Sequence, residues 1–293
     1  MDTFRAHRPS LFTLAYRMLG TATDAEDVLQ EAHLRFAQHA SDLQHPKPWL
    51  EQVVTRLCLD ELKSARVRRE EYVGPWLPEP LATDGAMLQG TPVDPESISF
   101  ALLTLLERLS PLERAVFVLV ELFDYSAEEA ATALEREVPT VRQLLHRART
   151  HVQAAKPRFA PSREAHLAIL GAFFAAVQTG DVKKVESFLV HDARATLDGG
   201  GQVKTARNVI YGADRVARLF IGLSKKVDLS LRLEVRQVNG WPALVMLEEA
   251  AAASVAQLET DGSVVYAVWV CSNPAKLGAM SRFGGLSRLS EHG

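Results

Sequence analysis

The chain has 293 residues, which is too long for one small domain and predicts two or three domains of ordinary size. Hydrophobic residues make up 47% of it and charged residues 24%, a balance that excludes a disordered or fibrous protein. The net charge of -3 excludes a protein that is basic overall, so contact with nucleic acid must come from local charge.

Residues 1–70 are predicted to form a helical domain. Apolar residues recur there at helix spacing in three segments, which Gly20 and the Pro46/Pro48 pair separate. The second segment carries a group of acids without a base. Such acids usually stabilise the first turn of a helix, and a second interpretation is a docking surface for a protein partner. The group comprises the acids Asp24, Glu26, Asp27 and Glu31, together with Gln30.

The third segment combines an aromatic residue with a basic end. Cations can follow a phosphate backbone and an aromatic ring can stack on unpaired bases. Alternatively, Trp49 packs with Leu50 and Val53, and the cations favour the C-terminal end of the helix dipole. We favour phosphate contact for the basic cluster and leave both interpretations open for Trp49. The residues concerned are Trp49, Arg56, Lys63, Arg66, Arg68 and Arg69.

Residues 71–98 are predicted to be a linker. Prolines are dense there, and acids occur without any Lys or Arg between Glu71 and Ile98. Proline blocks regular structure, and like charges favour an extended chain.

Residues 99–156 are predicted to form a second helical domain. Ser110-Pro111-Leu112-Glu113 and Ser126-Ala127-Glu128-Glu129 are capping boxes that mark two helix starts. A further helix beginning near Val138 has an apolar back and a polar outer face, as in a helix-turn-helix that reads the major groove. Its arginines and glutamine suit base edges and phosphates, although a solvated basic face is the alternative. The outer face comprises Arg142, Gln143, His146, Arg147, Arg149 and Thr150.

Residues 163–280 are predicted to form an α+β domain. Helices are expected over 164–177, 182–189 and 213–223, followed by two hairpins turning at Asn239-Gly240 and Asp261-Gly262. Helices on one face of a curved antiparallel sheet can enclose a cavity. The segment 281–293 has few apolar residues and is predicted to be a loosely ordered tail.

Taken in this order, the motifs resemble a bacterial sigma factor of the extracytoplasmic-function (ECF) group. Asp24-Ala25-Glu26-Asp27-Val28-Leu29-Gln30-Glu31 resembles the helix that grips the clamp of core RNA polymerase. The stretch from Pro48 to Arg69 resembles the part that melts and reads the -10 promoter element. Leu109-Ser110-Pro111-Leu112-Glu113-Arg114 with Thr140-Val141-Arg142-Gln143 and His146-Arg147-Ala148-Arg149 resembles the helix-turn-helix that reads the -35 element.

The resemblance implies a role for each of the three groups. Asp24, Glu26, Asp27, Gln30 and Glu31 would bind core RNA polymerase. Trp49, Arg56, Lys63, Arg66, Arg68 and Arg69 would bind -10 DNA, and Arg142, Gln143, His146, Arg147 and Arg149 would bind -35 DNA. The acidic linker, with Glu79 and Asp84, would thread the channel for nascent RNA, because an anionic strand imitates nucleic acid.

Four more motifs resemble those of sigma factors fused to a SnoaL-like domain of the cone-shaped NTF2-like superfamily. They are Trp76-Leu77-Pro78-Glu79-Pro80, Asp198-Gly199-Gly200-Gly201, Asn239-Gly240-Trp241-Pro242-Ala243-Leu244 and Asn273-Pro274-Ala275-Lys276-Leu277. The resemblance implies two all-α sigma domains followed by an α+β cone domain that regulates them in cis, without a separate anti-sigma factor. The regulatory interface would comprise Trp76, Leu77, Pro78, Glu79, Pro80, Asp198, Gly199, Gly200, Gly201, Asn273, Pro274, Lys276 and Leu277.

This chain departs from the family pattern at three places. Glu135-Arg136-Glu137 replaces a glycine-apolar-serine turn before the reading helix. Gln202 stands where a lysine often follows the glycines, and Ala275 stands where an acid is usual. These two departures predict that a salt link across the regulatory interface is missing.

We expect a protein that is not an enzyme and that needs neither a metal nor a cofactor. Cys58 and Cys271 lie far apart, and no spacing makes a catalytic pair among His166, His191, Asp192, Asp198 and Asp214. No apolar run reaches the ~20 residues of a membrane helix and no secretory leader begins the chain, so we expect a cytoplasmic protein without membrane contact.

Two alternatives stay open, and the cone domain could in either case hold a small-molecule ligand. A one-component, ligand-responsive helix-turn-helix regulator would not need the acidic helix or the -10-like segment. A SnoaL-like cyclase or isomerase fused to a DNA-binding module would need a clear acid/base pair.

Overall fold

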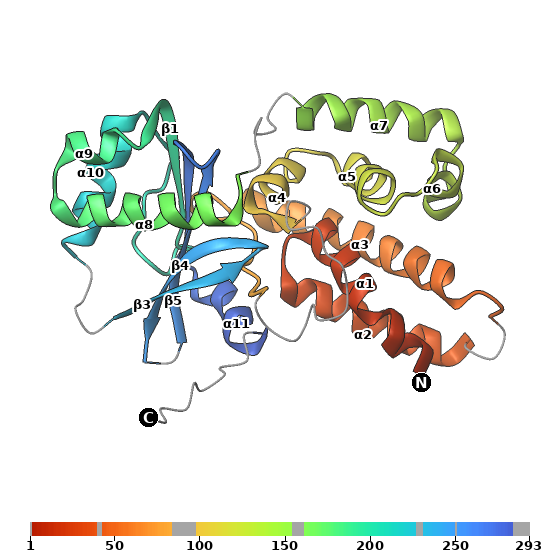
Figure 1. Ribbon diagram of the computed structural model, residues 1–293. Helices are drawn as coiled ribbons and strands as arrows, with labels where there is room; N and C mark the ends of the chain where they lie inside the picture. The colour runs from red at the N-terminus through yellow and green to blue at the C-terminus, as the bar shows by residue number, and fades with distance from the viewer. Residues whose placement is uncertain are drawn as a thin grey trace. The chain divides into compact units, whose positions relative to one another are not determined.

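The computed structural model describes residues 2–39, 43–83, 98–153, 161–226, 231–249 and 251–283. They belong to two compact units (Figure 1). The helical unit takes its described residues from Met1–Glu71 and Gly90–Lys156, and the C-terminal unit takes them from Tyr72–Gln89 and Pro157–Gly293. Residues 84–97 of the predicted linker, which include Asp84, and residues 284–293 lie outside the described residues.

The first half of the helical unit consists of α1 (Asp2–Leu19), α2 (Ala22–His39) and α3 (Pro46–Glu70), as the apolar spacing predicts. Gly20 ends α1 with a φ of 75°, and its N–H donates to the Tyr16 carbonyl at 2.8 Å. Ala25, Val28 and Leu29 of α2 are buried, because residues three and four apart share one face of a helix.

The second half consists of α4 (Phe100–Leu106), α5 (Pro111–Phe117), the π-helix η3 (Val118–Leu122), α6 (Ala127–Leu134) and α7 (Val138–Gln153). Both predicted capping boxes are present, with Ser110 paired to Glu113 and Ser126 paired to Glu129. The turn before α7 is closed by Glu135, whose φ of 52° is left-handed. A helix end of this kind usually takes glycine, so glutamate is an unusual residue for this conformation.

The two helical halves pack against each other within this unit, which the sequence does not predict. The buried Arg114 of α5 donates from Nε and Nη2 to the Arg17 carbonyl of α1, at 3.2 and 3.1 Å. The Tyr125 hydroxyl donates to Glu51 of α3 at 2.5 Å. Side chains from each half therefore satisfy polar groups of the other.

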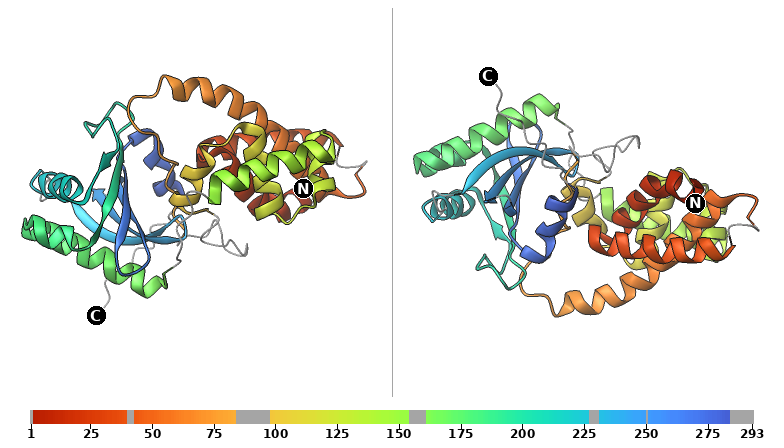
Figure 2. Two further views of the ribbon diagram at one scale, coloured as in Figure 1. Left: turned by 90° about the horizontal axis from the view of Figure 1, so that it is seen from above. Right: turned by 90° about the horizontal axis from the view of Figure 1, so that it is seen from below.

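The C-terminal unit is built on a six-stranded sheet with the strand order β2-β1-β6-β5-β4-β3. The strands are β1 (Leu189–Asp198), β2 (Ile210–Tyr211), β3 (Arg232–Val238), β4 (Trp241–Glu248), β5 (Ala251–Thr260) and β6 (Val265–Cys271). The helices are α8 (Arg163–Thr179), α9 (Val182–Glu186), α10 (Ala213–Ser224) and α11 (Pro274–Phe283). Figure 2 shows α8 and α10 on one side of the sheet and α11 on the other. The α+β class predicted for this part is confirmed.

The apolar core of this unit lies between the sheet and the α8/α10 layer. Phe173 and Phe220 meet edge to face, with ring centroids 5.8 Å apart. Alternate residues of β5, such as Ala256 and Leu258, point into the same cluster. The other face of β5 contacts α11, where Leu277 and Met280 are buried.

Three features of the unit differ from the sequence prediction. Helix α9 ends at Glu186, whereas the sequence predicts a helix up to residue 189, and β1 (Leu189–Asp198) was not predicted. Strand β1 pairs in parallel with β6, so the sheet is mixed rather than antiparallel. Helix α11 was not predicted, and it continues to Phe283, into the segment expected to be loosely ordered.

No helix in the described ranges is long and apolar enough to cross a membrane. Those ranges also contain no group of His, Cys, Asp or Glu residues that could hold a metal ion.

Candidate nucleic-acid interface and linker-binding cluster

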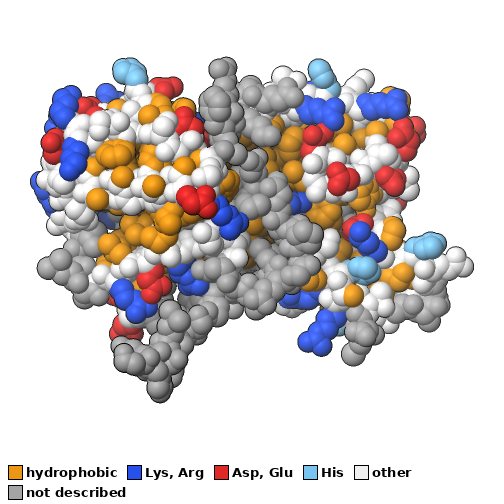
Figure 3. Space-filling view, in the orientation of Figure 1, with side chains coloured by type: hydrophobic (Ala, Val, Ile, Leu, Met, Phe, Trp, Pro, Cys, Tyr) orange, Lys and Arg blue, Asp and Glu red, His pale blue; other side chains and the backbone are white. Residues whose placement is uncertain are grey.

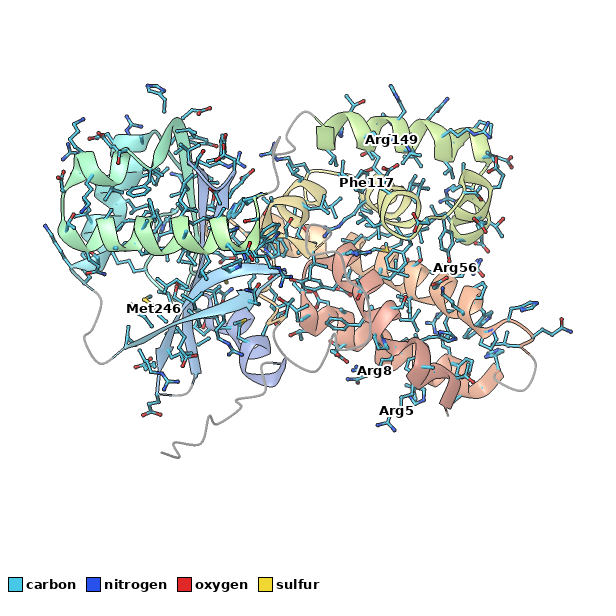
Figure 4. All side chains as sticks on the ribbon, in the orientation of Figure 1. Arg5, Arg8, Arg56, Phe117, Arg149 and Met246 are labelled. Carbon is cyan, nitrogen blue, oxygen red and sulfur yellow. The ribbon has the colours of Figure 1, made fainter. Side chains whose placement is uncertain are left out.

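Helix α7 presents the polar face predicted from the sequence. Val141, Ala148 and Val152 form part of its buried back. Figure 3 shows basic side chains along the exposed edge of this region, and Figure 4 labels Arg149 there. The residues that the structure brings together on the exposed face are Arg142, Gln143, His146, Arg147 and Arg149.

The arginines of this face are paired with carboxylates in the free protein. Arg142 contacts Glu128 at 2.8 Å, and Arg149 contacts Glu121 at 2.6 Å. Exposed pairs of this kind contribute about 0–1 kcal/mol each, so a phosphate group can displace the carboxylates at little cost. The face is therefore available to an anionic ligand.

Arg147 has a more buried partner than the other two arginines. Its Nε lies 3.3 Å from Oε1 of Glu113, the capping residue of α5. Burial alone would raise the pKa of Glu113, but hydrogen bonds from Ser110 and the charge of Arg147 together lower it. Glu113 thus stays ionised and holds Arg147 beside the start of α5.

The acidic residues of α2 differ in how far they are engaged within the helical unit. Asp24 accepts from the Thr21 hydroxyl at 2.5 Å, and Glu26 pairs with Arg8, labelled in Figure 4, at 2.5 Å. Glu31 pairs with Arg35 at 2.7 Å, one turn along the helix. Asp27 and Gln30, three residues apart on one face, are exposed.

The predicted -10 residues of α3 are not all free for DNA. Trp49 is half-buried between Phe36 and His39, whose ring centroids lie 6.3 and 5.7 Å from its own. Arg56, labelled in Figure 4, pairs with Glu135 at 2.7 Å. Lys63 pairs with Asp60 of its own helix at 2.8 Å. Arg66, Arg68 and Arg69 belong to the last turns of α3, and their side chains lie outside the described part of the chain.

In the C-terminal unit, Asp198 at the end of β1 binds the linker. Its Oδ2 accepts from the Leu77 N–H at 2.9 Å and from Lys276 Nζ at 2.6 Å, and its Oδ1 accepts from the Tyr72 hydroxyl at 2.5 Å. The Asp198 side chain is fully buried, and that of Lys276 is 9% exposed. A buried carboxylate persists only when it is paired and hydrogen-bonded, as it is here.

Lys276 completes this cluster from α11. Its Nζ donates to the Leu77 carbonyl at 2.5 Å, so both main-chain groups of Leu77 are bound by oppositely charged side chains. The same ammonium lies 4.2 Å from the Trp76 ring centroid and 4.9 Å from that of Tyr72, which adds cation–π attraction. Burial, aided by Asp198, raises the pKa of Tyr72, so its hydroxyl stays a donor at neutral pH.

The glycines after Asp198 allow close approach of the chain. Gly200 has a φ of 59°, and a Cβ there would overlap the Asn273 amide. Gly201 has a φ of 71° and a Cβ there would lie 3.2 Å from Cβ of Val73 in the linker. The Asn273 Nδ2 in turn donates to the Tyr72 hydroxyl at 2.8 Å.

Most of the residues predicted for the regulatory interface lie in or around this cluster. Leu77, Pro78, Glu79, Pro80, Asp198, Gly199, Asn273, Lys276 and Leu277 are buried, Trp76 and Gly200 are half-buried, and Gly201 and Pro274 are exposed. Sequence reasoning missed Tyr72, which lies just before the Trp76 motif, and did not assign a partner to Asn239.

Two expectations about this region differ from the structure. An ion pair, Lys276 with Asp198, is present, so the departures at Gln202 and Ala275 do not deprive the cluster of a salt link. Glu79, expected to follow an RNA channel, is only 2% exposed in the C-terminal unit. The linker around Glu79 is therefore a bound segment in this structure.

The acid/base candidates do not form a catalytic pair. His191 and Asp192 are exposed on β1, and Asp214 pairs with Arg218 at 2.9 Å. Asp198 is engaged by the linker, and His166 of α8 stacks on Trp241 with ring centroids 5.2 Å apart. Within the described ranges, no hydrogen bond joins any two of these five residues.

The buried His166 should make the C-terminal unit sensitive to acid. Burial lowers its pKa from an ordinary 6.5 to about 4, because the imidazolium is poorly solvated there. The unfolded chain takes up this proton near pH 6.5 and the folded chain only near pH 4. The stabilisation is therefore complete above pH 6.5 and is lost as the pH falls toward 4.

We expect the C-terminal unit to lose about 2 kcal/mol of its free energy of unfolding between pH 7 and pH 5. His166→Phe keeps a ring beside Trp241 and should remove this loss, whereas His191→Phe at an exposed position should not. Urea unfolding at the two pH values measures it. Equal pH dependence in the wild type and the His166→Phe variant would contradict the assignment.

Comparison with known proteins identifies the class of the two helical halves. Residues 3–68 match the family model described as "Sigma-70 region 2", and residues 99–152 match the model described as "Sigma-70, region 4". The halves that carry the acidic helix, the basic helix and the α7 face are thus those of a sigma-70 type protein.

Similarity to curated relatives extends over nearly the whole chain. This chain is 36% identical over 289 residues to the ECF RNA polymerase sigma factor SigJ of Mycobacterium tuberculosis H37Rv, and the match covers 94% of this chain and 92% of SigJ. It is 32% identical to the probable ECF RNA polymerase sigma factor SigI of the same organism, covering 94% and 93%. The crystal structure of M. tuberculosis SigJ matches with a TM-score of 0.75 and 33% identity, covering 95% and 98%. The chain belongs to the family of ECF RNA polymerase sigma factors.

Proposed function

We propose that this sigma factor binds core RNA polymerase and directs it to promoters, and that its C-terminal unit regulates it in cis. The proposed regulation rests on one observation: Asp198 and Lys276 form hydrogen bonds with both main-chain groups of Leu77. The linker joins regions 2 and 4, so holding it constrains the two parts that would read DNA. This is a role for the α+β unit that requires neither catalysis nor a separate anti-sigma factor.

The surfaces assigned to polymerase and DNA are proposals that the geometry supports to different degrees. For the polymerase, the exposed Asp27 and Gln30 are the best placed members of the acidic group. For the -35 element, the α7 face is exposed and its arginines have weak, exchangeable partners. For the -10 element, Arg56 has an exposed partner, Glu135, which DNA can displace at as little cost as the partners of the α7 arginines.

Run-off transcription with purified core polymerase tests the function. Promoter-specific product is the expected result. Repression of product made by another sigma factor would favour a one-component regulator, and turnover of a small molecule without DNA would favour an enzyme. Removing residues 164–293 should change the transcription rate and keep the same promoter preference, and an unchanged rate would count against regulation in cis.

Arg147→Ala should weaken -35 recognition by about 1–3 kcal/mol if the side chain reads a base edge. If Arg147 contacts a phosphate instead, the loss of binding free energy should be smaller and the same for every -35 sequence. Losing the pair with Glu113 should itself cost little, because Arg147 is exposed. Binding of the polymerase complex to matched and altered -35 sequences measures the effect, with Arg163→Ala as a control. If binding to the matched and to the altered -35 sequence were both unchanged, Arg147 would not be part of the interface.

A further inference from the structure

The turn between β3 and β4 contacts a second part of the linker. Strand β3 is at the edge of the sheet, so its outer N–H and C=O groups are not used by a neighbouring strand of the sheet. Ala82 of the linker forms an antiparallel bridge with Val238 at this edge. Leu81 and Ala82 are each only 1% exposed, so their peptide groups need partners within the protein.

Hydrogen bonds on both sides of this bridge follow the antiparallel pattern. The Thr83 N–H donates to the Gln237 carbonyl at 2.8 Å, and the Asn239 N–H donates to the Leu81 carbonyl at 2.8 Å. The Gly240 N–H donates to the Thr83 hydroxyl at 3.1 Å. The linker therefore adds to the edge as a short strand, recognised largely through its main chain.

Asn239 has two functions in this contact. With a φ of 50°, followed by 80° at Gly240, it forms the tight turn that joins paired strands. Its Oδ1 also accepts from the Leu81 N–H at 2.9 Å. Asn239 is fully buried. Gln257 of β5 stabilises the end of β3 by donating to the Val238 carbonyl at 2.7 Å. Glycine could form the same turn, but only a side chain with an acceptor can satisfy the Leu81 N–H.

We propose that the outer edge of β3 and the Asn239-Gly240 turn form a second linker-binding site, which holds residues 81–83 by strand addition. It differs from the charged site at Leu77 in its binding groups, because Asn239, Gly240 and the edge of β3 bind residues 81–83, whereas Asp198 and Lys276 bind Leu77. The site deepens the proposed regulation in cis and rests on it for its biological meaning. The site binds an extended main-chain segment, and the one side chain of that segment that it is proposed to recognise is the Thr83 hydroxyl, which accepts from the Gly240 N–H.

A linker held at two points responds differently from one held at a single point. Loss of the ion pair at Leu77 leaves residues 81–83 bound, and loss of the Asn239 contact leaves Leu77 bound. Full release of the linker then requires both sites to open. The Leu81 and Thr83 N–H groups report on the edge site, and the Leu77 N–H reports on the charged site.

Residue-resolved amide exchange on the full-length protein, without polymerase or DNA, tests the inference. Asn239→Gly keeps the turn and removes the acceptor, so exchange at Leu81 and Thr83 should become about 5- to 150-fold faster, the range for an unsatisfied buried N–H. Exchange at Leu77 should stay as in the wild type. Asp198→Asn should give the reverse pattern, and Asn208→Gly, at an exposed asparagine, should change neither site.

The inference is overturned if Asn239→Gly leaves Leu81 and Thr83 at wild-type rates, or if it accelerates Leu77 to the same degree while the amides of β5 keep their wild-type rates. If amides of β5 accelerate equally, the whole unit has opened, and the linker variant Thr83→Val decides instead. That variant removes only the acceptor for the Gly240 N–H, so it must accelerate the edge amides alone. The amide exchange rates do not depend on transcription. A failed run-off assay would therefore reject the proposed function but not the second linker-binding site.

Discussion

Lys276→Met should lower the free energy of unfolding of the C-terminal unit by about 3–5 kcal/mol, the usual cost of removing one partner from a buried ion pair. Methionine matches the length of the lysine stem, so packing is largely kept. Asp198, whose side chain is fully buried, would lose the cation that offsets its charge, and the Leu77 carbonyl would lose its donor.

Urea unfolding followed by tryptophan fluorescence measures this effect, because Trp76, Trp241 and Trp269 all lie in the C-terminal unit. Lys204→Met, at an exposed lysine, is the matched control and should change stability little. Adding Asp198→Asn to Lys276→Met should recover part of the loss, since a neutral amide needs no cation. A loss below about 1 kcal/mol for Lys276→Met would show that the pair is not buried as described.

Arg114→Met should have an effect of similar size on the helical unit, about 3–5 kcal/mol. Residue Arg114 is 1% exposed, and its guanidinium forms an ion pair with Glu107 and donates twice to the Arg17 carbonyl. The substitution would leave Glu107 and that carbonyl without these donors. It would also remove a direct link between the halves that match regions 2 and 4.

The helical circular dichroism signal during urea unfolding measures this second effect. Arg108→Met, at an exposed arginine six residues earlier, is the control. Arg114 belongs to the motif that resembles a DNA-reading element, yet its side chain is buried. We therefore expect promoter preference to be unchanged wherever the variant is folded. A change in -35 preference without a loss of stability would contradict this assignment.

Features that depend on neighbouring residues were predicted well from the sequence. The capping boxes at Ser110 and Ser126 use residues three apart, and the buried back of α7 follows a spacing of three and four. The hairpin turn at Asn239-Gly240 depends on conformations that these two residues adopt readily. Local physics decides each of these features, so a single sequence is enough.

Features that depend on distant partners were not predicted. In strand β1 the exposed pair His191-Asp192 interrupts the apolar pattern after Leu189 and Val190, and the strand is stabilised by parallel pairing with β6. Tyr72 is joined to Asp198, 126 residues away, and no periodicity encodes that contact. The resemblance to fused sigma factors indicated which motifs meet, whereas the ion pair between Lys276 and Asp198 needed the structure.

The linker's prolines have a consequence for its alignment with the C-terminal unit. The N–H groups of Leu77 and Leu81 are both bound, and Pro78 and Pro80 lie between them. Deleting one residue upstream would place Pro78 where Leu77 now donates, and inserting one would place Pro80 where Leu81 now donates. Since proline has no N–H, a shift by one residue in either direction loses a hydrogen bond. The two prolines therefore fix the register in which the linker binds the C-terminal unit.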